Sequence, residues 1–160
     1  MIPLFNSDGN LPPGIHWTEW SEILTRFGTN SHRRKLLEGL YNALIALKQA
    51  GCNTVFIDGS FVTKKDYPKD FDACWDLSGV NPDLLEPTLL DFSHGRASQK
   101  AKYFGELFPA QIFVGQRQST FLEFFQIDKD SGKKKGIIAI SQIPRKEAHD
   151  FRRGRNCGLL

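Results

Sequence analysis

The sequence has little cysteine and no long apolar run. Its 160 residues include three cysteines, an odd number without a C-x-x-C pair, which argues against a disulfide framework and a zinc site and fits a reducing compartment. No stretch of about 18 apolar residues is present, so we predict no membrane span. The first residues also lack the basic start and long apolar centre of a secretory signal. We therefore expect a cytoplasmic protein.

The charge of the chain is concentrated near its end. The whole sequence carries a net charge of +3. Residues 145–160 hold five basic and two acidic side chains, which accounts for all of it. We predict an irregular arm over 1–15, one domain over 16–144 and a flexible basic tail over 145–160. The tail either contacts nucleic acid or an acidic partner, or is simply solvated.

Hydrophobic spacing predicts a domain of mixed secondary structure. Leucines between 36 and 47 recur at three- and four-residue spacings, which is typical of one buried helical stripe. Helices are expected at 17–27, 30–49 and 93–104, a helix or turn at 81–90, and strands at 53–60, 70–77, 106–114 and 136–140; 120–126 is left unassigned. These elements predict an α/β (α+β) domain with a small mixed sheet and helices mainly on one side.

One segment combines a glycine turn with paired carboxylates. A buried strand is expected to end at Gly59, which permits close approach of the backbone to a ligand, and Ser60 adds an amide and a hydroxyl. Asp70 and Asp72 follow on the next strand and project from the same face, because side chains alternate along a strand. Two such carboxylates repel one another unless a cation lies between them, and Mg²⁺ prefers oxygen ligands. The segment therefore predicts a phosphate cradle beside a metal site.

This pattern resembles the signature of the polymerase-beta-like nucleotidyltransferases, in which an apolar-Gly-Ser turn precedes Asp-apolar-Asp. A wider set of segments is similar to a family of short bacterial nucleotidyltransferase-like proteins of largely unassigned role: LPPGIH (11–16), RFGTN (26–30), IDGSFV (57–62), LDF (90–92), QKAKY (99–103), ELFPA (106–110) and KGI (135–137). The resemblance implies a nucleotidyltransferase-like fold with a nucleoside triphosphate (NTP) as substrate and Mg²⁺ as cofactor, with Mn²⁺ as an alternative.

The resemblance also implies residue roles. Asp70 and Asp72 would hold two metal ions, and Gly59 and Ser60 would hold the triphosphate. The superfamily usually has a third carboxylate on a neighbouring strand, and we favour Glu106 because it begins the third expected strand. Asp91 is the alternative.

Several basic side chains near the motif have two interpretations. Lys64 and Lys65 lie in the loop between the motif's halves and either fold over phosphates or solvate that loop. Lys100 and Lys102 are too close in a helix to share a face, so one reaches the triphosphate while the other points to water, and we select Lys102. Arg33 and Arg34 are expected at the surface, with contact to phosphate as the alternative.

Two further polar residues, Asp58 and Gln111, bear on the prediction of a catalytic site. Asp58 is interpreted as a structural cap for a neighbouring backbone group. Gln111 stands where another carboxylate would have been plausible, and an amide cannot replace a charged ligand. The activity of the site therefore stays open.

Two functions from different classes follow. The first is a Mg²⁺-dependent transferase that moves NMP from an NTP to a hydroxyl of RNA, protein or a small molecule. The resemblance extends this to a bacterial toxin–antitoxin pair with a partner protein. The second is a catalytically decayed nucleotide-binding or partner-binding module, motivated by the uncertain third carboxylate and by Gln111.

Overall fold

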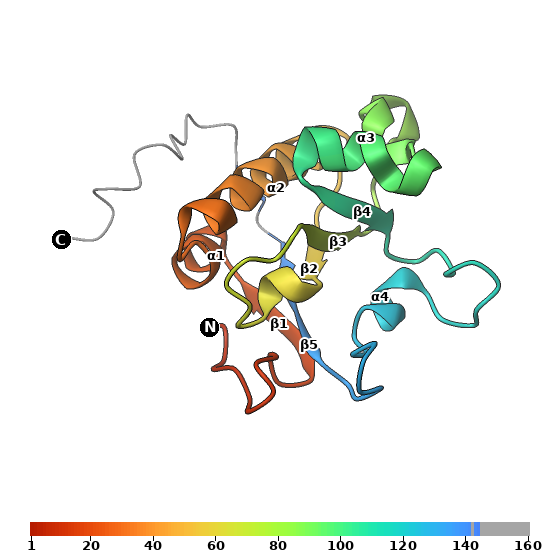
Figure 1. Cartoon of the computed structure of the whole chain (residues 1–160). Coiled ribbons are helices and arrows are strands. Elements are labelled where there is room, and N and C mark those ends of the chain that lie inside the picture. Colours follow the sequence, from red (N-terminus) through yellow and green to blue (C-terminus); the bar gives the residue numbers. More distant parts are fainter. Residues whose placement is uncertain (142, 145–160) are drawn as a thin grey trace.

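A five-stranded mixed sheet organises the protein (Figure 1). The structure is a computed structural model that describes residues 1–141 and 143–144. The strand order is β1-β5-β2-β3-β4, with β1 and β5 parallel, β2 antiparallel to both its neighbours, and β3 and β4 parallel. The strands are β1 (Gly14–Thr18), β2 (Val55–Asp58), β3 (Phe71–Trp75), β4 (Gly105–Pro109) and β5 (Gly136–Ile140). The expected mixed α/β fold is confirmed.

Three of the four α-helices in the described residues, the first three along the chain, cover one face of this sheet. The helices are α1 (Trp20–Phe27), α2 (Ser31–Gln49), α3 (Ser93–Tyr103) and the single turn α4 (Phe121–Phe124). The helix α2 begins where the Asn30 side chain accepts a hydrogen bond from the Arg33 amide at 2.8 Å. Its leucine stripe, including the fully buried Leu40, packs with Ile57 and Leu107 of the sheet in the main core. Burial of this stripe explains why the spacing of its leucines predicts the helix correctly.

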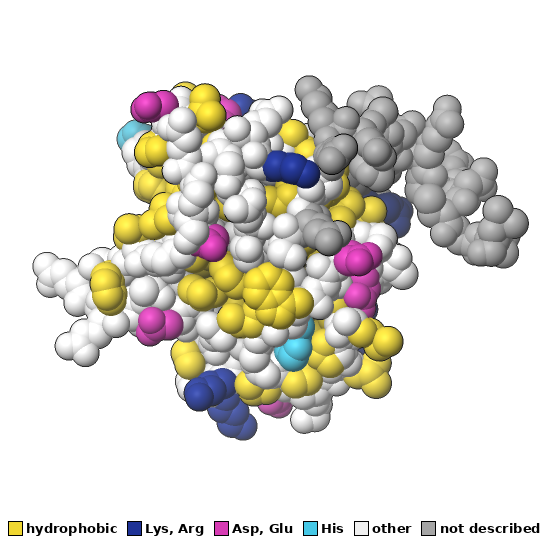
Figure 2. All heavy atoms as spheres, turned by 180° about the vertical axis from the view of Figure 1, so that it is seen from behind, with side chains coloured by type: hydrophobic (Ala, Val, Ile, Leu, Met, Phe, Trp, Pro, Cys, Tyr) yellow, Lys and Arg dark blue, Asp and Glu magenta, His cyan; other side chains and the backbone are white. Residues whose placement is uncertain are grey.

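The opposite face of the sheet holds a smaller core. Phe56, Cys74 and Ala139 lie there, and Phe121 and Phe125, from α4 and the residue after it, pack against them. Adjacent strand residues alternate between the two faces, so β2, β3 and β5 each contribute to both cores. On the side of the molecule seen in Figure 2, hydrophobic side chains gather near the middle and basic side chains stand singly around them.

The first strand differs from the prediction. Residues 14–18 form β1 and pair with residues 136–140, whereas the sequence predicts an irregular arm to 15 and a helix from 17. The helix α1 starts only at Trp20. The prediction is wrong because the partner of β1 lies about 120 residues further along the chain, beyond any local signal.

The segment predicted as a helix or turn at 81–90 consists of turns. Residues 81–90 form two 3₁₀ turns, η2 (Pro82–Leu84) and η3 (Pro87–Leu90). The helix α3 includes three consecutive left-handed residues at 94–96, and β4 ends at Pro109, on the edge of the sheet where its missing donor is tolerated. The part of the chain that the structure describes contains no helix long and apolar enough to cross a membrane. The predicted tail at 145–160 lies outside it.

Candidate functional site

The glycine turn and the second aspartate of the motif are in direct contact. The antiparallel pairing of β2 and β3 places Asp58 opposite Asp72, so the chain turns at Gly59 beside the Asp72 carboxylate. Gly59 has φ = 77° and ψ = −168°, which favours glycine strongly. A Cβ at this position would clash with Oδ2 of Asp72 and lie 3.0 Å from its Cγ. Gly59 therefore makes room for the carboxylate.

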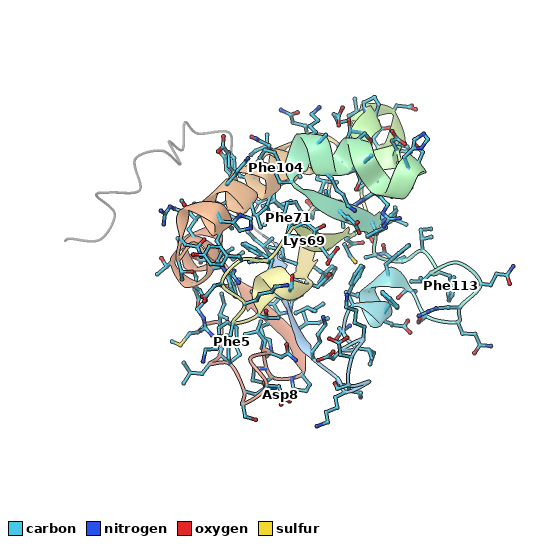
Figure 3. The ribbon with its side chains drawn as sticks, viewed as in Figure 1. Phe5, Asp8, Lys69, Phe71, Phe104 and Phe113 are labelled. Atoms are coloured by element: carbon cyan, nitrogen blue, oxygen red, sulfur yellow. The ribbon has the colours of Figure 1, made fainter. Side chains whose placement is uncertain are left out.

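Glu106 extends this arrangement across a third strand. The parallel pairing of β3 and β4 puts Asp72 and Glu106 in register, so both side chains lie on the same face. Asp70 precedes Asp72 by two residues and shares that face, while Phe71 points into the main core below α2 (Figure 3). We call Asp58, Asp70, Asp72 and Glu106 the carboxylate row.

The carboxylates of the row repel one another. Burial, and then the charges of Asp70 and Glu106, raise the pKa of Asp72 to about 7. Burial and the charge of Glu106 also raise the pKa of Asp70. A cation placed at the row would relieve this repulsion, which is the electrostatic property of a cation site.

Two basic side chains partly compensate the row from one end. Lys100 Nζ lies 2.8 Å and Arg96 Nη2 3.2 Å from the same oxygen of Glu106, Oε1. Arg96 has φ = 61°, an unusual conformation for a residue with a side chain, and its guanidinium lies over the Phe108 ring. Sequence reasoning missed Arg96 because a residue with a side chain rarely adopts the left-handed conformation that Arg96 has here.

Asp58 is the most buried member of the row. It is fully buried, and its Oδ2 accepts from the Cys74 thiol at 3.8 Å. Within the described residues its Oδ1 has no hydrogen-bond partner. Burial and the charge of Asp72 raise its pKa well above the usual range, and Lys135 opposes that shift. The interpretation of Asp58 as a backbone cap is wrong, because register with Asp72 turns the side chain onto the sheet face.

The lysines separate into two groups. Lys102 forms an ion pair with Glu86 at 3.0 Å, whereas Lys100 reaches Glu106 of the carboxylate row. The two lie on different helix faces, as their spacing requires. The role of Lys102 at the triphosphate stays a prediction. Lys64 and Lys65 are exposed in the loop after Ser60, where either of their interpretations stays a prediction.

The alternative third ligand lies outside the row. Asp91 accepts hydrogen bonds from the hydroxyls of Ser93 (2.5 Å) and Ser98 (2.8 Å). Gln111 follows β4 and binds Asp76 Oδ1 at 2.6 Å, so it does not face Asp72. Of the two candidates, Glu106 is therefore the one in register with the motif.

The donor set of the row suits a hard cation, although it is not closed around one. All four members offer carboxylate oxygens, the ligands that Mg²⁺ prefers. Across residues 1–141 and 143–144, no three His, Cys, Asp or Glu side chains are already arranged to hold a metal ion. The ion pairs of Arg96 and Lys100 with Glu106 are consistent with this open arrangement, because they occupy one of its oxygens.

The fold and the row define a mixed α/β protein with a cluster of acidic side chains on the less covered face of its sheet. A family model matches residues 3–141, and the chain belongs to this family of unknown function, DUF6932. Searches of curated proteins and of solved structures found no match.

Proposed function

We propose that the protein is a Mg²⁺-dependent nucleotidyltransferase that binds an NTP at the carboxylate row and transfers its NMP to a hydroxyl. The observation that carries the proposal is the position of Asp72, which packs against Gly59 on one side and stands in register with Glu106 on the other. A triphosphate site and an oxygen-ligand cation site would thereby share one sheet edge.

Each part of the site has a role in this reaction. Asp70, Asp72 and Glu106 would hold the metal, which when bound neutralises the triphosphate and lowers the pKa of the acceptor hydroxyl. Gly59 lets the backbone approach the phosphates, and Ser60 offers its amide and hydroxyl. The acceptor oxygen forms a bond to the α-phosphorus, the bond to the bridging oxygen breaks, pyrophosphate leaves, and the hydroxyl proton passes to solvent.

The cations at Glu106 have a place in the same proposal. Arg96 and Lys100 share one oxygen of Glu106. A metal ion bound to that oxygen would therefore have to displace them from it. Both side chains would then be free to neutralise phosphate oxygens close to the metal. Positioning and charge neutralisation of this kind account for most of the catalysis of phosphoryl and nucleotidyl transfer.

Label transfer from each of four α-labelled NTPs, with Mg²⁺ or Mn²⁺, tests the proposal. Total RNA and host lysate supply the acceptors. We expect label on RNA or protein with the wild type and none with Asp70→Asn or Asp72→Asn. Asp91→Asn is the matched control, because that carboxylate lies outside the row, and it should retain activity. Equal labelling by wild type and Asp72→Asn would overturn the assignment.

The second candidate is a decayed nucleotide-binding or partner-binding module. The two cations on Glu106 favour it, because they satisfy the third carboxylate without any metal. Binding of an NTP without release of pyrophosphate in either metal would select this function. An acceptor protein or a toxin–antitoxin partner belongs to the first candidate and would be identified by the labelled species.

A further inference from the structure

The loop that follows Gly59 and Ser60 is fastened to the start of α2 by one buried arginine. Arg33 is only 3% exposed, although the sequence predicts it at the surface. Its guanidinium donates to the carbonyl oxygens of Phe61 at 2.7 Å, Thr63 at 3.0 Å and, through Nε, Lys65 at 3.1 Å. It also lies 5.0 Å from the centre of the Phe61 ring. Three alternate carbonyls of the loop therefore converge on one side chain.

Thr63 connects Arg33 to the glycine turn. Thr63, held through its carbonyl by Arg33, donates from its hydroxyl to the carbonyl of Ser60 at 2.6 Å. The Thr63 amide also lies 3.3 Å from the same oxygen. The position of Ser60 relative to the carboxylate row thus depends on the loop that Arg33 holds.

Neighbouring side chains of the same helix end bind the rest of the loop. Asn30 Nδ2 donates to the Asp66 carbonyl at 2.8 Å, and the His32 ring contacts the Pro68 carbonyl oxygen. Burial lowers the pKa of Arg33, and the nearby charge of Asp66 opposes that effect. An arginine stays charged under such conditions, so its bonds to the carbonyls are charge-assisted.

We infer that Arg33 is a positioning residue, which fixes residues 60–66 and with them Ser60, next to the Gly59 turn that packs against Asp72 of the carboxylate row. Its consequence for nucleotide binding rests on the proposed function. The anchoring of the loop by Arg33 does not depend on that function. Arginine suits this task because its planar fork donates several bonds in fixed directions, which the single ammonium of lysine does not reproduce.

Two variants of adjacent residues test the inference. Arg33→Lys keeps the charge and removes the fork, whereas Arg34→Lys is the matched control. Arg34 donates to the carbonyl of Gly28 at 3.2 Å and contacts none of the loop carbonyls that Arg33 holds. Amide hydrogen exchange of residues 61–66 should become about tenfold faster or more in Arg33→Lys, because each lost charge-assisted bond contributes about one factor of ten. Arg34→Lys should leave those amides unchanged.

The affinity for NTP with Mg²⁺, measured where every variant is folded, gives the second readout. We expect about tenfold weaker binding in Arg33→Lys and unchanged binding in Arg34→Lys. A variant that melts earlier but binds with wild-type affinity and wild-type exchange in the loop would overturn the inference. Absence of NTP binding in the wild type would instead contradict the proposed function, and the exchange measurement alone would then decide the role of Arg33.

Discussion

The two faces of the sheet differ in the side chains that they bury. The face below α2 is mainly apolar, and its Ile57 is completely buried, as is Leu40 of the helix above it. The other face carries a small apolar core next to four carboxylates, one of which, Asp58, is fully buried with an oxygen that lacks a partner among the described residues. Burial of apolar surface stabilises a fold, whereas buried like charges destabilise it. A face that keeps such charges at a cost in stability is a functional candidate, and a face that lacks them is a structural one.

The largest expected effect lies on the structural face. Leu40→Ala should lower the free energy of unfolding by about 2–5 kcal/mol, because it removes a buried side chain and leaves a cavity. Leu84→Ala is the control, since that leucine is 60% exposed, and should change stability by no more than about 0.5 kcal/mol. Urea unfolding measures both values. Equal losses would mean that the helix-covered face is not the main core.

A substitution on the carboxylate face should have the opposite effect on stability, because removal of a charge there stabilises the fold. The folded-state pKa of Asp72, about 7, lies above its ordinary value of 3.8, so the folded protein binds more protons between these values. Ionisation of Asp72 therefore destabilises the fold progressively as pH rises from about 4 to 7. Asp72→Asn should become more stable than the wild type across that range, by up to about 4 kcal/mol at pH 7.

Urea unfolding of both proteins at several pH values tests this prediction, and subtraction of the two curves removes the contributions of other carboxylates. A constant difference between pH 4 and 7 would contradict the raised pKa. Addition of Mg²⁺ should narrow the difference at pH 7, since a ligand bound by the folded wild type stabilises it by mass action.

Substitution of one glycine on each side of the sheet should have a smaller effect on stability. A Cβ at Gly39 would clash with the backbone oxygen of Tyr103, and one at Gly59 would clash with the Asp72 side chain. Gly39→Ala should lose about 1–3 kcal/mol of stability, the usual range for overpacking, without a change in NTP affinity of the folded protein. Gly59→Ala should lose a similar amount and also weaken NTP binding. Thermal melts and binding titrations separate the two effects, and unchanged binding in Gly59→Ala would remove Gly59 from the site.

The smallest effect concerns the lysines of α3. Lys102→Ala breaks an exposed ion pair with Glu86 and should cost no more than about 1 kcal/mol. It should leave NTP affinity unchanged, whereas Lys100→Ala should weaken it, because only Lys100 reaches Glu106. Isothermal titration with each NTP and Mg²⁺ measures the affinities. The reverse order would favour Lys102 as the phosphate ligand.

Local patterns predict the elements that depend on local physics. The leucine stripe of α2, the Asn30 cap and the motif strands β2 and β3 follow from the periodicity and cap chemistry of adjacent residues. The placement of Glu106 on the strand after α3 also follows from the sequence, although its register with Asp72 does not.

The features that sequence reasoning missed depend on distant parts of the chain. The strand β1 needs β5 as its partner, and the burial of Arg33 needs a loop about 30 residues away. Arg96 reaches Glu106 only because residues 94–96 adopt left-handed backbone angles, which two of them, as residues with side chains, rarely take. Tertiary contacts determine all three, and a single sequence carries no direct record of them.

The position of β5 also has a consequence for how the chain folds during synthesis. The strand β5 is the latest of the five along the chain, yet it lies between β1 and β2 in the sheet. Until it leaves the ribosome, β1 has no partner and one edge of β2 stays unpaired. Such long-range closure slows folding, because the chain entropy must be lost before the contacts form. A nascent chain that stalls before Gly136 would therefore expose two open strand edges, the kind of surface on which aggregation begins.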